Sequence, residues 1–191
     1  VDTSWLEVSL SPEGLRGVAA RRDIPEGATV LGVPLSLCVS DPALPGVGTG
    51  LERLSPAGLV AWRALPWQAR MAVSLAGERL AGQASRLFPY LRLLDREGPR
   101  VPAAWTEEEV AQLQDPSLEQ QVEELQFWEH SLYDDLTVLH LTHASPIEDH
   151  ALPSRQDFLW ALRTLQSRTI RLAPEDWETG DAAQFATVGG A

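Results

Sequence analysis

The sequence contains no lysine and no asparagine, and its 191 residues include a single cysteine. All fifteen basic residues are therefore arginine, which is typical of the codon usage of a GC-rich genome. The lone Cys38 excludes an internal disulfide and cannot build a zinc site alone, which fits a reducing compartment. Its apolar context, LSLCVS, predicts a small buried hydrophobic side chain.

Negatively charged residues strongly outnumber positively charged ones in this chain. The formal net charge is −12, and no basic stripe runs along the sequence. Because such a chain repels phosphate, nucleic-acid binding is disfavoured. No apolar run reaches the roughly 18 to 20 residues that span a bilayer, so we predict no membrane insertion. No signal peptide is visible after Val1, and the loose final run TVGGA leads us to expect a processed or partial chain.

The first forty residues carry strand signals. Short alternating or β-branched segments are separated by two Pro-Glu-Gly turns, as the strands of hairpins are. The expected strands cover residues 5–10, 17–20 and 29–33, with a further short strand at 35–39. They predict a small antiparallel sheet.

Beyond residue 58 the spacing of apolar residues changes from two to about 3.6, which predicts helices. Pro66 is expected to break the first helical segment. The expected apolar stripe around this break consists of Leu59, Trp62, Leu65, Met71, Leu75 and Leu80.

Three further helices follow from capping and periodicity. Thr106 with the acidic run 107–109 predicts an N-cap and a short helix to residue 113. A long helix is expected over about 117–143, and its predicted buried face holds Leu118, Val122, Leu125, Leu132, Leu136 and Leu139. Ser154 is expected to cap a last helix whose buried side holds Phe158, Leu162 and Leu165.

Strands followed by helices predict the α+β class. We expect an N-terminal β-region over 1–40, a Pro- and Gly-rich connecting loop over 41–58, a helical region over 59–171 and a flexible tail over 172–191.

Residue chemistry alone points to no catalytic centre. His140 and His143 are one helical turn apart, with Glu148, Asp149 and His150 just after them. No HExxH or CxxC motif accompanies this cluster, so solvated or hydrogen-bonded histidines are favoured over a metal site. The sequence also lacks a GxSxG motif, and its paired carboxylates fall where solvated helix faces are expected.

The stretch EGLRGVAARRDIPEG at residues 13–27 leaves two interpretations open. Its glycines do not form a dinucleotide-binding motif, because a strand rather than a helix follows them. A glycine turn between strands can bring backbone groups close to a flat ligand, since glycine has no Cβ to block the approach. By spacing alone, however, a simple β-hairpin is favoured.

Four segments in the same order resemble the SET-domain protein lysine methyltransferases of the Rubisco large-subunit methyltransferase type. They are EGLRGVAARRDIPEGATVLGVPLSLCVS, ERLAGQASRLFPYLRLL, PAAWTEEEVAQLQ and DFLWALRTLQSRTIR. The resemblance covers most of residues 5–171. It implies that the first segment is the N-terminal part of a SET domain, and that the other three belong to a long helical insertion in that domain.

The resemblance also implies a site for S-adenosylmethionine. In the family a glycine turn lies against this cofactor, and here it corresponds to Glu13, Gly14 and Leu15, with Arg16 and Gly17 adjoining. A Ser-Arg pair at the end of the last insertion helix matches Ser167 and Arg168. A guanidinium can pair bidentately with the cofactor carboxylate, while backbone carbonyls suit its ammonium group.

The sequence departs from the family after residue 171. An Asp-x-x-Asn-His segment, a catalytic tyrosine and a helical substrate-binding domain are expected there, but the chain has no Asn, and Tyr90 and Tyr133 do not match the tyrosine. We therefore expect one part of a methyltransferase that modifies lysines of a protein substrate, with no catalytic residue in this chain. A catalytically inactive subunit bound to the other subunits of a larger protein complex is the alternative. The family suggests the chloroplast stroma, with the cytoplasm as the alternative location.

Overall fold

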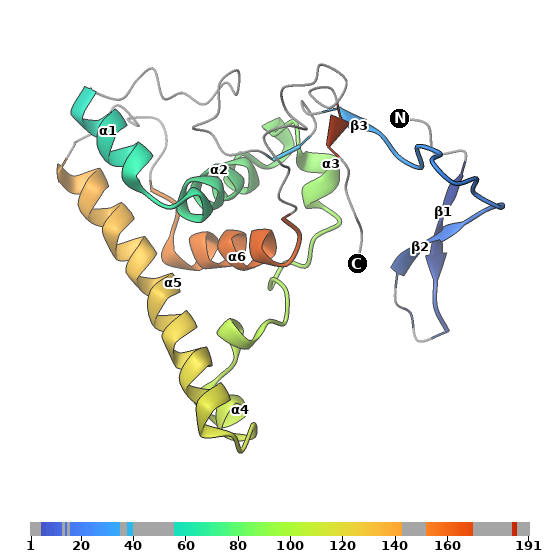
Figure 1. The fold of residues 1–191 in the computed structure, drawn as a ribbon. Helices are drawn as coiled ribbons and strands as arrows, with labels where there is room; N and C mark the ends of the chain where they lie inside the picture. Colours follow the sequence, from blue (N-terminus) through green and yellow to red (C-terminus); the bar gives the residue numbers. More distant parts are fainter. Residues whose placement is uncertain are drawn as a thin grey trace. The chain divides into compact units, whose positions relative to one another are not determined.

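The computed structural model describes residues 5–12, 14, 16–34, 38–39, 56–142, 152–169 and 185–186 (Figure 1). The chain consists of two compact units. One is formed by both ends of the sequence, Val1–Val39 and Arg168–Ala191, and the other by Ser40–Ser167. The first contains antiparallel strands and the second contains helices, so the α+β content expected from the sequence is present.

A β-hairpin opens the first unit. Strands β1 (Leu6–Leu10) and β2 (Arg16–Ala20) pair antiparallel, with Val8 opposite Val18. Gly14 lies in the connecting turn, where its N–H donates to the Ser11 carbonyl at 2.9 Å and its φ is +80°. Glycine adopts this left-handed conformation without the steric cost that a side chain brings. The hairpin predicted for this stretch is therefore confirmed.

The third predicted strand, at 29–33, is wrong over most of its length. Residues 29–32 are irregular, and β3 contains only Val33–Pro34. Gly32 weakens a strand and Pro34 has no N–H for a ladder, which accounts for the short pairing. β3 pairs antiparallel with β4 (Phe185–Ala186), which no periodicity in the sequence indicated. Cys38 is half-buried and not in a strand, and residues 35–37 lie outside the described part of the chain.

One face of the hairpin is apolar and open. Residues directly opposite one another on paired strands share a face, which here carries Leu6, Val8, Leu10, Val18 and Ala20, with Arg16 opposite Leu10 at its end. Val8 is 73% exposed, Leu10 69% and Val18 64%. These five residues, termed the apolar hairpin face, gain little from burial against the rest of the described chain.

The helical unit begins with two helices separated by Pro66, as the sequence predicts. Helix α1 (Pro56–Ala64) ends before Pro66, and α2 (Trp67–Ala81) begins directly after it. Arg70 donates to the carbonyls of Arg63 and Leu65, so its guanidinium satisfies carbonyl groups at the end of α1.

The core of this unit lies between α2 and α6 (Arg155–Gln166), which form the most extensive contact between helices. Both helices bring small and branched apolar side chains to it. Those exposed by 1% or less are Ala69, Ala72, Leu75, Ala76, Phe158, Ala161 and Leu162. The predicted buried side of α6 is confirmed, and so is its cap, because Ser154 Oγ accepts from the Asp157 N–H at 3.1 Å.

Short elements connect α2 to the long helix. They are the 3-10 helix η3 (Gly82–Ala84), α3 (Phe88–Leu91), the 3-10 helix η4 (Pro102–Ala104) and α4 (Glu107–Ala111). The predicted Thr106 cap of α4 is confirmed as a capping box. Thr106 Oγ1 accepts from the Glu109 N–H at 3.3 Å, and Glu109 Oε2 accepts from the Thr106 N–H at 2.9 Å.

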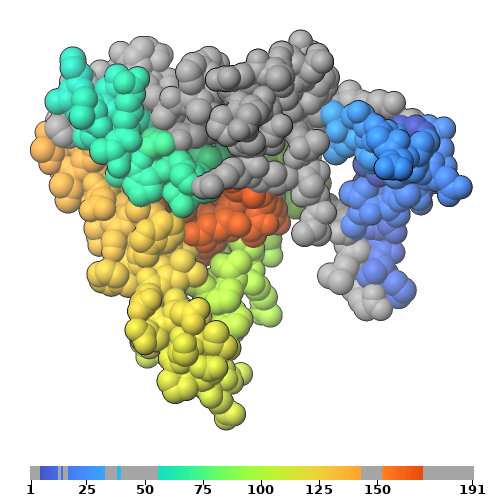
Figure 2. All heavy atoms as spheres, in the orientation of Figure 1, coloured from blue at the N-terminus to red at the C-terminus, as the bar shows by residue number. Residues whose placement is uncertain are grey.

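Helix α5 (Pro116–Thr142) is close to its predicted extent. Val122, Leu132 and Leu136 are buried as expected, whereas Leu118 at the first turn is 45% exposed. In Figure 2, α6 presents only a strip of surface between α5 and the segment that precedes α4. No helix in the described ranges is long and apolar enough to span a bilayer.

Of the stripe predicted along α2, Met71 and Leu75 are buried and Leu80 is not, and this gives a matched pair of substitutions. Leu75 is 1% exposed, whereas Leu80, assigned to the same stripe, is 57% exposed. Leu75→Ala should lower the free energy of unfolding by about 2–5 kcal/mol, because it leaves a cavity in the core. Leu80→Ala should change it by less than about 0.5 kcal/mol. Urea unfolding followed by far-UV circular dichroism measures both, and equal losses would contradict the packing described.

Candidate functional site

Of the residues predicted to contact a cofactor near the N-terminus, the structure describes Gly14, Arg16 and Gly17. Gly14 and Gly17 are exposed, and a Cβ built on either would meet no atom within 4 Å. Arg16 and Gly17 begin β2, opposite Leu10 and Ser9. Glu13 and Leu15 lie outside the described residues. The backbone at Gly14 is thus accessible.

The predicted Ser-Arg pair lies directly after α6. Ser167 is the C-cap residue, its N–H donates to the Arg163 carbonyl at 3.2 Å, and its hydroxyl donates to the Thr164 carbonyl at 2.9 Å. Arg168 follows and is exposed. The division between the two units falls between these residues, so Arg168 belongs to the same unit as Gly14. Their joint contact with a cofactor stays a prediction.

The histidine cluster weighed as a metal site is described only in part. His140 lies in the last turn of α5, whereas 143 and 148–150 lie outside the described residues. Among the residues that the structure does describe, no three His, Cys, Asp or Glu side chains come together as metal ligands.

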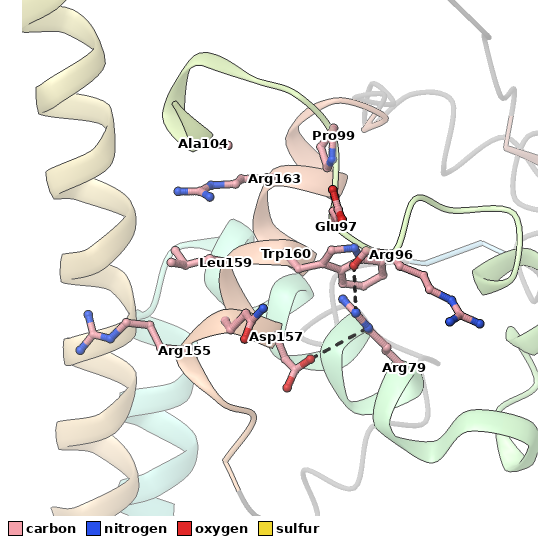
Figure 3. A pocket seen from close by; sticks show the side chains of 12 residues that line it. Arg79, Arg96, Glu97, Pro99, Ala104, Arg155, Asp157, Leu159, Trp160 and Arg163 are labelled. Carbon is pink, nitrogen blue, oxygen red and sulfur yellow. Dashed lines mark hydrogen bonds and ion pairs between the residues drawn. The ribbon is translucent and has the colours of Figure 1, made fainter. Parts of the chain in front are cut away.

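A different site, which the sequence did not single out, lies within the helical unit. It is an open cleft of about 660 Å³ between α6, the C-terminal part of α2 and the segment around residues 96–104 (Figure 3). We term it the arginine cleft. Its lining residues are Arg79, Arg96, Glu97, Gly98, Pro99, Ala104, Arg155, Gln156, Asp157, Leu159, Trp160 and Arg163.

The Trp160 side chain lines this cleft and is held in place by a hydrogen bond and a cation–π contact. Its indole Nε1–H donates to the Asp95 carbonyl at 2.8 Å. The Arg79 guanidinium lies over the ring, with Cζ 4.0 Å from the centroid. Gly98 has a φ of +94°, and a Cβ there would come within 3.1 Å of Trp160 Cδ1. Gly98 is therefore required both for its conformation and for its approach to the ring.

Arg79 is held by the same cluster. Its Nη2 donates to the Arg96 carbonyl at 3.1 Å, and its Nε lies 4.0 Å from Asp157 Oδ1, as the dashed lines in Figure 3 show. One guanidinium thus links α2, the 95–98 turn and the first turn of α6.

The guanidinium of Arg163 pairs with a buried carboxylate on α5, that of Glu129. Its Nε donates to Glu129 Oε2 at 2.8 Å and its Nη2 donates to the Ala103 carbonyl at 2.6 Å. Glu129 is 0% exposed, and its Oε1 has no hydrogen-bond partner in the described part of the chain. Burial raises the pKa of the Glu129 carboxyl, and the adjacent Arg163 opposes this shift only in part.

The outer end of the cleft is formed by Arg155, at the start of α6. Its Nη2 pairs with Asp134 Oδ1 at 2.5 Å, its Nη1 lies 3.2 Å from His130 Nδ1, and its guanidinium lies over the Tyr133 ring. Arg96 differs from these arginines. It is exposed, and its guanidinium has no hydrogen bond or ion pair with the described residues.

The sequence contained a signal for Glu129 that we missed. Spacings of three and four along the predicted face of α5 run from Val122 and Leu125 to Leu132 and Leu136. Position 129 lies between Leu125 and Leu132 on the same face of the helix, where an apolar residue is expected. An acid in a core slot of a helix requires a partner, and an arginine on a neighbouring helix is the usual one.

The raised pKa of Glu129 predicts a specific pH dependence. The folded chain binds this proton more tightly than the unfolded chain, whose glutamates titrate near pH 4.3, about the ordinary value. The resulting stabilisation is complete below that pH and is lost as the pH rises through the folded-state pKa. The free energy of unfolding of the wild type, relative to Glu129→Gln, should therefore fall between about pH 4 and neutrality. A rise over this interval would mean that attraction by Arg163 outweighs burial.

Comparison with known proteins adds no relative. The chain matches no protein-family model, no curated protein and no solved structure at a significant level. What this molecule does must be argued from its own residues and their geometry.

Proposed function

We propose that this chain forms the N-terminal β-region and the helical insertion of a SET-type, S-adenosylmethionine-dependent protein-lysine N-methyltransferase. The observation that carries the proposal is the order of the units. The β-unit is built from both ends of the chain, and the helical unit Ser40–Ser167 is inserted between them. The sequence resemblance implies the same arrangement, a long helical insertion within a SET domain.

Two features of the β-unit support a methyl-donor site. The turn at Gly14 presents backbone groups without a side chain in the way, and Arg168 supplies an exposed guanidinium in the same unit. S-adenosylmethionine carries an ammonium group that backbone carbonyls accommodate and a carboxylate that arginine binds bidentately. In the proposed site Ser167, Arg168, Arg16, Gly17 and the 13–15 turn bind the donor.

The transfer step needs a deprotonated lysine amine aligned with the donor methyl group. Tyr133 of the helical unit does not supply that alignment. The Tyr133 hydroxyl donates to the Pro153 carbonyl at 2.9 Å, and its ring packs on Phe158 with centroids 5.4 Å apart. Neither Tyr90 nor Tyr133 matches the tyrosine of the family, so we propose no catalytic residue in this chain. The proposed substrate is a protein, and the proposed location is the chloroplast stroma, with the cytoplasm as the alternative.

The proposal predicts the effect of a single substitution on cofactor binding. In the full-length parent, Arg168→Ala should weaken S-adenosylmethionine binding by about tenfold or more, because a hydrogen bond to a charged group contributes roughly 1.5–3 kcal/mol. Isothermal titration calorimetry measures this directly. Arg100→Ala, which removes an exposed arginine of the helical unit, is the matched control and should leave the affinity unchanged. A parent that binds no S-adenosylmethionine, or an affinity that Arg168→Ala leaves intact, would contradict the proposal.

One observation favours the alternative, a catalytically inactive subunit of a larger complex. The apolar hairpin face exposes three large aliphatic side chains side by side, and surfaces of this kind often mark protein contacts.

The alternative makes its own prediction. If the apolar hairpin face binds another subunit, Val8→Glu should shift the native mass of the parent from that of a complex to that of a monomer. Ser9→Glu, on the opposite face of β1, should not. Light scattering after size exclusion measures both variants. A monomeric wild type would rule out this alternative.

A further inference from the structure

We infer that the side of α5 that faces away from the core is a docking surface for a basic amphipathic helix of a partner protein. We term it the α5 outer face, and its exposed residues are Glu123, Glu124, Phe127, Asp134, Asp135, Val138 and Leu141. All of them belong to the helical unit. The inference therefore does not depend on the proposed methyl-donor site, and it can be tested without S-adenosylmethionine.

Three large apolar side chains lie on this face. Phe127 is 78% exposed, Val138 61% and Leu141 73%, whereas Val122 and Leu136 of the same helix are buried. At about 100° per residue, Phe127 lies roughly 140° around the helix from Val122, and Val138 lies roughly 160° from Leu136. Figure 1 shows α5 along one edge of the helical unit. The three side chains therefore gain little from burial against the described part of the chain.

The same local arrangement of acidic and apolar residues occurs twice along the face. The pair Glu123-Glu124 precedes Phe127, and the pair Asp134-Asp135 precedes Val138, by four and three residues in each case. Positions three and four apart are neighbours on a helix surface, so two carboxylates lie beside each of these apolar side chains. Positions 123 and 134 are eleven residues apart, as are 127 and 138, which is three turns and about 16 Å along the helix.

The negative charge of this face is largely uncompensated. Helix α5 contains six carboxylates and no arginine. Arg155 of α6 pairs with Asp134. Arg163 of α6 pairs with the buried Glu129. The remaining four carboxylates form no ion pair with the described residues, and they are those of Glu119, Glu123, Glu124 and Asp135. A cationic partner would therefore be attracted to α5 without displacing an existing ion pair.

Charge and spacing together specify the partner. Spacings of four and three separate positions 127, 131, 134, 138 and 141, and a second helix packs along a row of this kind. Apolar side chains of that helix would cover Phe127, Val138 and Leu141. Lys or Arg side chains that flank them would pair with the carboxylates of α5, which orients the two helices.

Other occupants fit this face less well. Helices that lie on membrane surfaces carry Lys or Arg on their polar side, whereas α5 carries carboxylates, which anionic lipids repel. A second copy bound through the same face would bring acidic side chains against one another. A basic helix of another protein is the occupant that the charge favours.

The test uses the 191-residue chain and a fluorescein-labelled peptide of three Leu-Lys-Lys-Leu-Ala-Lys-Ala repeats. A peptide of the same composition in shuffled order keeps the charge but loses the helical spacing of Leu. Fluorescence anisotropy should detect saturable binding that is at least about fivefold tighter for the ordered peptide, because only that peptide can cover the apolar side chains as a helix. Added NaCl should weaken the binding.

Two matched pairs of substitutions localise the binding. Phe127→Ser should weaken it by about tenfold, because a large apolar contact is lost. Val60→Ser, which removes a 70% exposed apolar side chain of α1, should weaken it by less than about twofold. Glu123→Arg should also weaken it by about tenfold, because repulsion replaces attraction. Glu26→Arg changes the net charge equally but lies in the other unit, and its effect should stay below about twofold. All four positions are exposed, so circular dichroism should show unchanged folding.

Several outcomes would overturn the inference. They are an absence of binding, equal binding of the ordered and the shuffled peptide, or equal effects of the two substitutions within either pair. Self-association of the wild-type chain that Phe127→Ser abolishes would assign the face to a second copy instead. Sedimentation of the chain with phosphatidylserine vesicles, lost in the same variant, would assign it to a membrane surface.

Discussion

The close packing of α2 on α6 is the constraint on which the helical unit depends. Ala69, Ala72 and Ala76 on α2 and Ala161 on α6 have no exposed surface, and side chains this small let two helices approach closely. Leu75 and Phe158 fill the remaining space. Because the buried face of α6 is fixed in this way, Arg155, Leu159 and Arg163 fall on another side of the helix, where they line the cleft, and Trp160 meets Arg79 of α2.

Polar interactions then fasten the other segments to this pair of helices. Trp160 holds the 95–98 turn through the Asp95 carbonyl, and Arg163 holds both η4 and α5 through Ala103 and Glu129. Residues that look like surface arginines in the sequence are therefore structural links between segments. Of the four cleft arginines, only Arg96 has a guanidinium without a partner among the described residues.

Local rules predicted much of the helical unit. Pro66 as a break, Thr106 and Ser154 as caps and the buried side of α6 follow from short-range chemistry that the surroundings do not override. Prediction failed where contacts between residues distant in the sequence determine the local structure. Leu80 lies five residues after Leu75, about 140° around the helix, so it faces away from the core that holds Leu75. Residues 29–32 form no strand, and β4 forms by pairing with β3. The arginine cleft joins residues up to 84 positions apart, from Arg79 to Arg163, so no motif could indicate it. The cofactor residues stay predictions, since Glu13 and Leu15 lie outside the described part of the chain.

The central proposal is that the unit formed by both ends of the chain binds a methyl donor through the backbone at Gly14 and the guanidinium of Arg168. A crystal structure of the full-length parent with S-adenosylhomocysteine tests this most directly. The account predicts that S-adenosylhomocysteine lies against the backbone at Gly14, with its carboxylate paired to the Arg168 guanidinium. A ligand bound elsewhere, or these two residues on opposite sides of the molecule, would contradict it.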